Sequence, residues 1–157
     1  DNSLSSVNIK EAINKSQSLF KTQLDNNQIE FILIGDECIA HINENEFRQV
    51  LINLINNAKD EILEKKIKDP KIEVSITKSD ENCIINIEDN AGGIKEEVMP
   101  RLFEPYFTTK TEGKGTGLGL YMSKKIVEES MKGEIKVSNG KNGAVFTITL
   151  KHVTDET

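Results

Sequence analysis

Two asparagines and one aspartate share a face of a predicted helix. Apolar residues recur at helical spacing between positions 47 and 62, and Asn53, Asn57 and Asp60 fall within a ~60° sector of that helix. Amide and carboxylate oxygens suit a hard cation such as Mg²⁺, which keeps waters and phosphates as its other ligands. An ordinary solvated helix face also carries such residues, so both interpretations stay open for this feature alone.

The segment DNAGG, residues 89–93, follows a short apolar strand pattern. A carboxylate at Asp89 can accept a hydrogen bond from the exocyclic amine of adenine. The two glycines let the backbone approach a flat base closely. Because Asp, Asn and Gly are common turn residues, a tight turn without a ligand is the alternative interpretation.

The glycine-rich segment GKGTGLGL, residues 113–120, opens a predicted helix. Its amides and the helix N-terminus can receive phosphate. The segment lacks the GxxxxGK[ST] pattern, which excludes a P-loop, and it does not follow a strand as a dinucleotide site would. A flexible linker is the bland alternative, but Leu118 and Leu120 disfavour it because linkers do not alternate glycine with large apolar residues.

The segment LFEPYFTTK, residues 102–110, holds three of the eight aromatic residues of the chain. The simplest interpretation is a small hydrophobic cluster that pins a loop. Lys110 could reach the terminal phosphates of a nucleotide as a mobile positive charge.

The elements that must position these residues follow from periodicity and turn residues. Asn43 with Glu46 three residues later is typical of a helix N-cap, and Pro70 disfavours continuation of that helix. A last helix ends at Gly133, and the tail from Lys151 is expected to fray. The predicted elements are helices over 9–24, 43–68 and 116–131, loops with one short helix over 90–115, and strands over 28–34, 38–42, 72–76, 83–87, 134–137 and 144–150, the first two strands forming a hairpin.

Helices and strands therefore mix without strict alternation, which predicts an α+β fold with helices on one face of a mixed sheet. The length of 157 residues fits one domain, residues 1–157 with a core over about 7–150. A net charge of −6 disfavours binding to nucleic acid, which needs a basic face. The chain starts at Asp1 without a leader pattern, so we expect a piece of a longer protein whose membrane attachment stays open.

Cys38 and Cys83 are isolated in the sequence, with no CxxC pair and no neighbouring histidine to complete a metal site. The pattern predicts buried or half-buried reduced thiols. Reduced thiols fit a cytoplasmic domain.

Read together and in order, NLINNAKDE (53–61), DNAGG, LFEPYFTTK and GKGTGLGL resemble the N, G1, F and G2 boxes of the histidine kinase catalytic domain. The resemblance covers residues 7–150, and residues 143–147 match a final glycine box less distinctively. It implies the Bergerat, or GHKL, ATP-binding fold shared with gyrase, MutL and the Hsp90 chaperones. That fold is a two-layer α/β sandwich with an open site under a lid.

The resemblance also implies roles for individual residues, with ATP and Mg²⁺ as cofactors. Asn57 would ligate Mg²⁺, and Asn53 would contact phosphate or metal-bound water. Asp89 would select adenine, and Gly93 would give the base room. Phosphate contacts are implied for Thr109, Lys110, Gly115, Thr116, Gly117, Leu118 and Gly119, and the final glycine box adds Thr147 to the nucleotide site.

Two positions, Asp60 and Ala91, depart from the family pattern. Asp60 stands where many sensor kinases carry lysine, as in the subgroup resembling nitrogen-regulation kinases, so Lys110 could supply the missing charge. Ala91 replaces a common first glycine of the G1 box. Asn53 stands where the ATPase relatives carry a water-activating glutamate, and asparagine is no useful base at neutral pH. Asn53, Asn57 and Lys110 are therefore the expected catalytic residues for phosphoryl transfer.

Neither histidine of this chain fits the family pattern for the residue that accepts the phosphoryl group. His41 lies in a predicted strand and His152 in the tail, and neither resembles the helical acceptor motif. The expected partners are a histidine-bearing dimerisation domain of a homodimeric parent and a downstream response regulator. A noncatalytic nucleotide-binding module and a GHKL-type ATPase are the alternatives.

Overall fold

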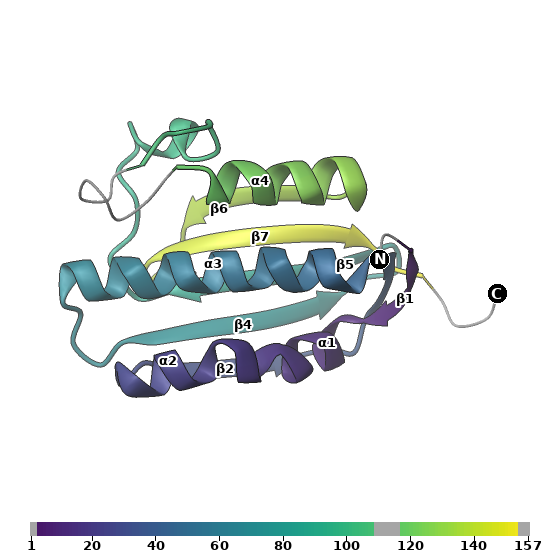
Figure 1. Cartoon of the computed structure of the whole chain (residues 1–157), viewed down its shortest axis with the longest axis horizontal. Coiled ribbons are helices and arrows are strands. Elements are labelled where there is room, and N and C mark those ends of the chain that lie inside the picture. Colours follow the sequence, from purple (N-terminus) through teal and green to yellow (C-terminus); the bar gives the residue numbers. More distant parts are fainter. Residues whose placement is uncertain (1–2, 109–116, 154–157) are drawn as a thin grey trace.

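A 22-residue helix, α3 (Glu44–Lys65), runs along the centre of the fold in the computed structural model, which describes residues 3–108 and 117–153 (Figure 1). Asn43 Oδ1 accepts a hydrogen bond from the amide of Glu46 at 3.0 Å, which confirms the predicted N-cap. The predicted apolar stripe is fully buried and comprises Phe47, Val50, Leu51, Leu54, Ile55, Ala58 and Ile62. Lys66, at φ 53°, ends the helix in the left-handed conformation.

A five-stranded sheet lies behind α3 with strand order β2-β4-β5-β7-β6. Strand β2 pairs parallel with β4, and the other three pairs are antiparallel, so the sheet is mixed. The strands are β2 (Glu30–Gly35), β4 (Lys71–Lys78), β5 (Asn82–Asp89), β6 (Glu134–Asn139) and β7 (Ala144–Lys151).

Burial alternates along the central strands, so one face of the sheet is covered and the other is open. In β5 every second residue from Cys83 to Asp89 is buried, as a period of two requires. Helices α1 (Ile9–Ser16), α3 and α4 (Gly119–Lys125) lie side by side over the covered face (Figure 1). The predicted α+β sandwich with helices on one face is therefore confirmed.

The predicted hairpin between residues 28–34 and 38–42 is wrong. Strand β2 continues along β4, where Gly35 pairs with Ile76 and the amide of Asp36 bonds to the Ile76 carbonyl at 2.9 Å. Strand β3 (Ile39–Ile42) pairs instead with β1 (Ser5–Asn8) in a separate two-stranded sheet. Adjacent strands in the sequence thus belong to two different sheets.

Two predicted helices are interrupted. The first comprises α1, a 3₁₀ turn η1 (Gln17–Leu19) and α2 (Lys21–Asn26). The last is α4 followed by a π-helical turn η3 (Ile126–Ser130), and its predicted start at 116 lies outside the described residues. The short helix expected after residue 90 is a single 3₁₀ turn, η2 (Met99–Arg101). No helix of the described part of the chain has the length and apolar character needed to cross a membrane.

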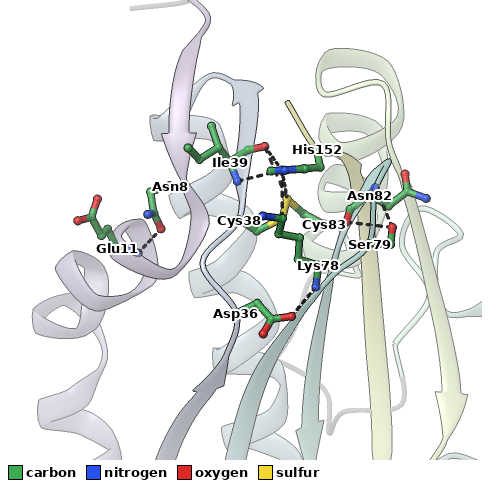
Figure 2. Close-up of a disulfide and its surroundings, with 10 residues drawn as sticks. All are labelled: Asn8, Glu11, Asp36, Cys38, Ile39, Lys78, Ser79, Asn82, Cys83 and His152. Atoms are coloured by element: carbon green, nitrogen blue, oxygen red, sulfur yellow. Dashed lines mark hydrogen bonds between the residues drawn. A yellow bond between two sulfur atoms is a disulfide. The ribbon is translucent and has the colours of Figure 1, made fainter. Parts of the chain in front are cut away.

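Cys38 and Cys83 are buried, as predicted, but they form a disulfide across 45 residues (Figure 2). The expectation of reduced thiols is wrong in this structure, because the fold places Cys38, just before β3, and Cys83, near the start of β5, with their Cα atoms 5.9 Å apart. His152 lies beside both sulfurs, so a histidine does neighbour the cysteines in space. The fraying predicted from Lys151 is also wrong through Val153, since the His152 amide bonds to the Glu81 carbonyl at 2.7 Å.

Candidate active site

A cavity of about 530 Å³ lies between α3, the ends of β5 and β7, and the segments on either side of residues 109–116. One side of its wall is polar and carries Asn53, Asn57, Asp60 and Asp89. The apolar part of the wall consists of Ala91, Ile94, Val98, Leu102, Phe107, Leu120, Ala144 and Phe146. A cavity in which convergent polar groups meet an apolar wall is a usual form of a small-molecule site.

The predicted polar face of α3 lines this cavity. Asn53, Asn57 and Asp60 are half-buried there, next to the buried stripe of the same helix. The side-chain amide of Asn53 donates to the Gly119 carbonyl and, at 2.7 Å, to Ser123 Oγ. Asn53 therefore joins α3 to the first turn of α4 in addition to facing the cavity.

Asp89 ends β5 with its carboxyl group at the cavity wall and only 5% of the residue exposed. Its Oδ1 accepts hydrogen bonds from the amides of Ala91 at 2.9 Å and Ala144 at 3.4 Å. Burial raises the pKa of Asp89 above its ordinary value of 3.8, and these two amides oppose the rise. A ligand amine that donates to this carboxylate would offset part of the cost of burying its charge.

Hydrogen bonds to three distant segments hold the DNAGG turn and the residue that follows it. Asn90 Oδ1 accepts from the amide of Lys71 at 2.9 Å. Lys65 Nζ donates to the carbonyls of Ala91 at 2.9 Å and Gly93 at 3.1 Å. Asn139 holds the next residue by accepting from the Ile94 amide at 2.7 Å and donating to the Ile94 carbonyl at 2.8 Å.

Gly93 lines the cavity at φ 88°, a conformation that favours glycine. A Cβ atom there would lie 2.7 Å from Asn139 Oδ1. The neighbouring Gly92 has φ 85° but no atom within 4 Å of such a Cβ. Glycine at position 93 is therefore required both by the backbone and by the close approach of Asn139.

The described end of the glycine-rich segment also reaches the cavity. Gly117 and Gly119 line it, and Leu118 stands between them as the residue that precedes α4. The Gly117 carbonyl accepts from the amide of Tyr106 at 2.8 Å, so this segment packs directly on LFEPYFTTK. A Cβ at Gly117 would lie 2.3 Å from the Tyr106 carbonyl carbon, which leaves no room for a side chain.

Phe103 and Phe107 of LFEPYFTTK pin a loop, as predicted, whereas Tyr106 is exposed. The rings of Phe103 and Phe146 meet edge to face at 6.2 Å, and the Arg101 guanidinium lies 4.5 Å from the centre of the Phe107 ring. Phe107 and Thr108 then reach the cavity wall. The loop is thus anchored to β7 next to the glycine-rich segment.

Not every predicted residue is at the cavity. Thr147 lies on the opposite face of β7, where its hydroxyl donates to Asn86 Oδ1 at 2.6 Å, and it does not line the cavity. Thr109, Lys110, Gly115 and Thr116 lie outside the described residues. The cavity therefore brings together Asn53, Asn57, Asp60, Asp89, Gly93, Gly117 and Gly119.

No sequence pattern pointed to two of the residues that shape the site. Lys65 sits in the last turn of α3 and reads as an ordinary solvated lysine, paired with Glu61 at 3.5 Å. Asn139, the last residue of β6, looks like a turn residue in the sequence, although it holds Ile94 from 45 positions away. Contacts between residues so far apart in the sequence leave no local sequence pattern.

Comparisons with known proteins agree with this geometry. Residues 42–154 match the family model described as histidine kinase-, DNA gyrase B-, and HSP90-like ATPase. Sporulation kinase A of Bacillus subtilis is 34% identical over 146 residues, which cover 91% of this chain and 23% of that protein. The eight curated relatives compared are all sensors or kinases by name, and the chain spans between 12% and 31% of their lengths.

Solved structures give the same assignment. The catalytic domain of histidine kinase ThkA matches with a TM-score of 0.82 and 30% identity, covering 94% of this chain and 95% of that chain. A structure of ThkA in complex with the response regulator protein TrrA matches with a TM-score of 0.79 and 25% identity, covering 98% of this chain and 43% of that chain. The chain therefore belongs to the family of histidine kinase-, DNA gyrase B- and HSP90-like ATPases, and its relatives within that family are sensor histidine kinases.

Proposed function

We propose that this chain binds ATP with Mg²⁺ in the 530 Å³ cavity and donates the γ-phosphoryl group to a histidine on a separate dimerisation domain. The observation that carries the proposal is the convergence of three features on one cavity. These are the buried carboxyl group of Asp89, the amide of Asn57 and the glycine segment before α4. In the proposal these features bind, in order, the adenine base, the Mg²⁺ ion and the phosphates.

Adenine binds next to Asp89 in this proposal. The carboxylate accepts from the exocyclic amine, and guanine carries a carbonyl oxygen at that position, which the carboxylate would repel. Gly93 leaves space beside the base, while Ile94, Val98 and Leu102 offer apolar contact. Asn139 and Lys65 position the Gly93 turn by holding its backbone.

The donor set at Asn57 fits Mg²⁺. Within residues 3–108 and 117–153, no hydrogen bond engages the side-chain amide of Asn57, so its Oδ1 is available as a ligand. Asp60 and Glu61 line the same wall and add negative charge near it. Mg²⁺ is held by few protein oxygens and by substrate phosphates, and when bound it would neutralise phosphate charge.

The phosphates lie along the glycine segment in this proposal. The amides from Gly115 to Gly119 hold them, and Thr109 and Lys110 approach from the preceding segment. Gly117 and Gly119 line the cavity, which supports this arrangement. Lys110 compensates for Asp60, which stands where many relatives carry a lysine.

Asn53 favours transfer over hydrolysis. An amide cannot take a proton from water at neutral pH, and the Asn53 nitrogen is already used to hold Gly119 and Ser123. Phosphoryl transfer depends mainly on alignment of donor and acceptor with electrostatic stabilisation of the charge. A separate histidine, brought close by a dimerisation domain, provides the acceptor.

The proposed partners follow from the relatives. The chain spans less than a third of the curated relatives it matches, so its parent is proposed to carry the dimerisation domain and sensor parts. The similarity to ThkA, solved with its response regulator, supports a regulator as the next acceptor. We place this chain in the cytoplasm, where ATP is available, with a membrane-anchored parent as one arrangement.

Radiolabel transfer from ATP tests the proposal. The chain is mixed with the histidine-bearing segment of its parent, and label on that segment is followed in time with Mg²⁺ present. The Asn57→Ala variant should lose most of the transfer, while Asn86→Ala, on the open face of β5, should retain it. The chain alone should bind ATP without labelling itself and should hydrolyse it very slowly.

Three outcomes would contradict it. Rapid labelling of the isolated chain would show an acceptor within it. Nucleotide binding without any labelling of the added segment would favour a noncatalytic module. Fast hydrolysis by the chain alone would favour the ATPase alternative.

A further inference from the structure

Cys38, Cys83 and His152 form a cluster that the proposed nucleotide site does not use (Figure 2). His152 Nδ1 lies 3.6 Å from the sulfur of Cys38 and 4.0 Å from the sulfur of Cys83. Cys83 is the second residue of β5 and Asp89 is the last, so the cluster lies ~20 Å along the strand from the cavity wall. A ligand bound here would therefore occupy a site separate from the nucleotide.

Backbone hydrogen bonds hold the three residues from separate elements. The Cys38 carbonyl accepts from the Ile9 amide at 2.8 Å, and Cys83 is paired with Lys78 and Leu150 on the two sides of β5. The His152 amide donates to Glu81 at 2.7 Å, and the next amide, of Val153, donates to Ile39 at 2.8 Å. The cluster therefore keeps its arrangement whether or not the sulfurs are bonded to each other.

We propose that the reduced form of this chain binds one Zn²⁺ ion through the thiolates of Cys38 and Cys83 and Nδ1 of His152. Among residues 3–108 and 117–153, this is the group of Cys, His or acidic residues whose ligand atoms all lie within 4.8 Å of one another. Two thiolates and one imidazole are ligands that zinc prefers.

The distances suit a tetrahedral ion. Zinc bonds of ~2.3 Å to sulfur and ~2.0 Å to nitrogen place neighbouring ligand atoms about 3.5 to 3.8 Å apart. The two nitrogen–sulfur distances, 3.6 and 4.0 Å, are already close to these values. Once the bond between the sulfurs is broken, rotation of the two cysteine side chains has to bring only the sulfur–sulfur distance into the same range.

The burial of the two cysteines favours a metal ion that neutralises their thiolates. Cys38 and Cys83 are 1% and 0% exposed, and two unpaired thiolates there would be costly. One Zn²⁺ with two thiolates and a neutral imidazole has no net charge. His152 is half-buried, and in this proposal a water molecule supplies the fourth ligand.

The disulfide and the zinc site exclude each other. A dithiol reductant gives two electrons and two protons to the disulfide, which becomes two thiols while the reductant becomes a disulfide. Zinc then replaces the two thiol protons, which pass to solvent. In a reducing compartment, zinc would thus restore the link between β3 and β5 that loss of the disulfide removes.

Cobalt(II), which replaces zinc with visible absorption, tests the site. The chain is reduced, freed of reductant without oxygen, and titrated with Co²⁺. The expected result is a thiolate-to-cobalt charge-transfer band that saturates at one equivalent and disappears when Zn²⁺ is added. The oxidised chain should show no band. His152→Ala should weaken binding by roughly tenfold or more, as loss of a direct ligand should cost at least as much as loss of an outer-shell partner.

His41→Ala is the matched control, because His41 is exposed on β3 and should leave binding unchanged. Native mass spectrometry of the unsubstituted chain gives a test without variants, with the gain of one zinc and the loss of two protons on binding. A reduced chain without the cobalt band, or a mass without bound zinc, would overturn the proposal. Equal affinity of His152→Ala and the unsubstituted chain would overturn the assignment of His152 as a ligand.

Discussion

The side-chain amide of Asn53 donates a hydrogen bond to the hydroxyl of Ser123 at 2.7 Å and so joins α3 to α4. Ser123 is buried, with 2% of its surface exposed, and the same amide also reaches the Gly119 carbonyl. The residue expected to contact phosphates therefore also fixes the start of the helix that follows the glycine segment. Its structural and functional effects can be separated by substitution.

Asn53→Ala should lower the free energy of unfolding by ~1 to 3 kcal/mol, because it leaves buried acceptors without a donor. Ser123→Ala should cost less, since the Gly119 contact remains. Urea denaturation measures both, and a double-mutant cycle should give a coupling of at least ~0.5 kcal/mol. Asn56→Ala, on a neighbouring position of α3, is the control, and strict additivity of Asn53 and Ser123 would contradict the contact.

Asp89→Asn should separate nucleotide binding from stability. The asparagine keeps an oxygen that accepts from the amides of Ala91 and Ala144, but its NH₂ group would place a donor opposite the donor amine of adenine. Affinity for ATP should fall by ~1 to 3 kcal/mol, the scale for leaving a buried polar partner unpaired. Calorimetry measures the loss, and unchanged affinity would argue against adenine contact at Asp89.

The contribution of Asp89 to folding stability should decrease as pH rises. Burial raises the folded pKa of Asp89 above 3.8, so the folded state binds this proton more tightly than the unfolded chain. The contribution of Asp89 is therefore fully present below pH 3.8 and is lost as pH rises through the raised pKa. Urea denaturation at a series of pH values should show that, as pH rises through the raised pKa, the free energy of unfolding falls more for the unsubstituted chain than for Asp89→Asn. A gain over the same range would mean that the pKa is lowered in the folded state.

The adjacent glycines 92 and 93 form a matched pair. Both have positive φ, so alanine at either position costs ~1 to 2 kcal/mol in backbone strain. Only Gly93 has a neighbour, Asn139 Oδ1, that a Cβ would meet at 2.7 Å. Gly93→Ala should therefore be less stable than Gly92→Ala by ~1 kcal/mol or more in chemical denaturation, as the clash displaces a bonded side chain.

Adding Asn139→Ala tests that reason. The truncation removes the clash, so the extra cost of Gly93→Ala should largely disappear in the double variant. The cost of Gly92→Ala should be the same with or without Asn139. Equal and additive costs at both glycines would show that backbone strain alone matters.

Local patterns predicted the parts of the fold that local physics determines. The apolar stripe and N-cap of α3 were readable because helix period and capping operate within a few residues. The pairing partner of β2 could not be predicted, because the residues of a short apolar strand do not show whether it forms a hairpin with the next strand or pairs with β4. The disulfide was missed for a similar reason, since 45 residues separate its cysteines.

The candidate site divides in the same way. Motif spacing identified Asn57, Asp89 and Gly93, which all line the cavity. Thr147 could have been placed better, because a strand of period two with Phe146 facing the helices turns Thr147 to the other face. Lys65 and Asn139 could not be found from the sequence, since each acts on backbone groups more than 20 positions away.

Reduction of the disulfide should destabilise the fold without affecting the nucleotide site. A crosslink across 45 residues limits the unfolded chain, and its loss should lower the free energy of unfolding by about 2 to 4 kcal/mol. Urea denaturation with and without a phosphine reductant measures this, in buffer with a chelator so that no metal replaces the link. ATP affinity should stay the same, because Cys83 and Asp89 stand at opposite ends of β5.

The variant with both Cys38→Ser and Cys83→Ser is the control for the reductant. It should match the reduced chain to within ~1 kcal/mol, since serine loses some apolar contact, and should not respond to reductant. If the oxidised and reduced chains unfold at the same urea concentration, the link between β3 and β5 does not constrain the unfolded state. If reduction lowers ATP affinity as well, the two ends of β5 are coupled, and the disulfide end of the sheet influences the cavity through the strand itself.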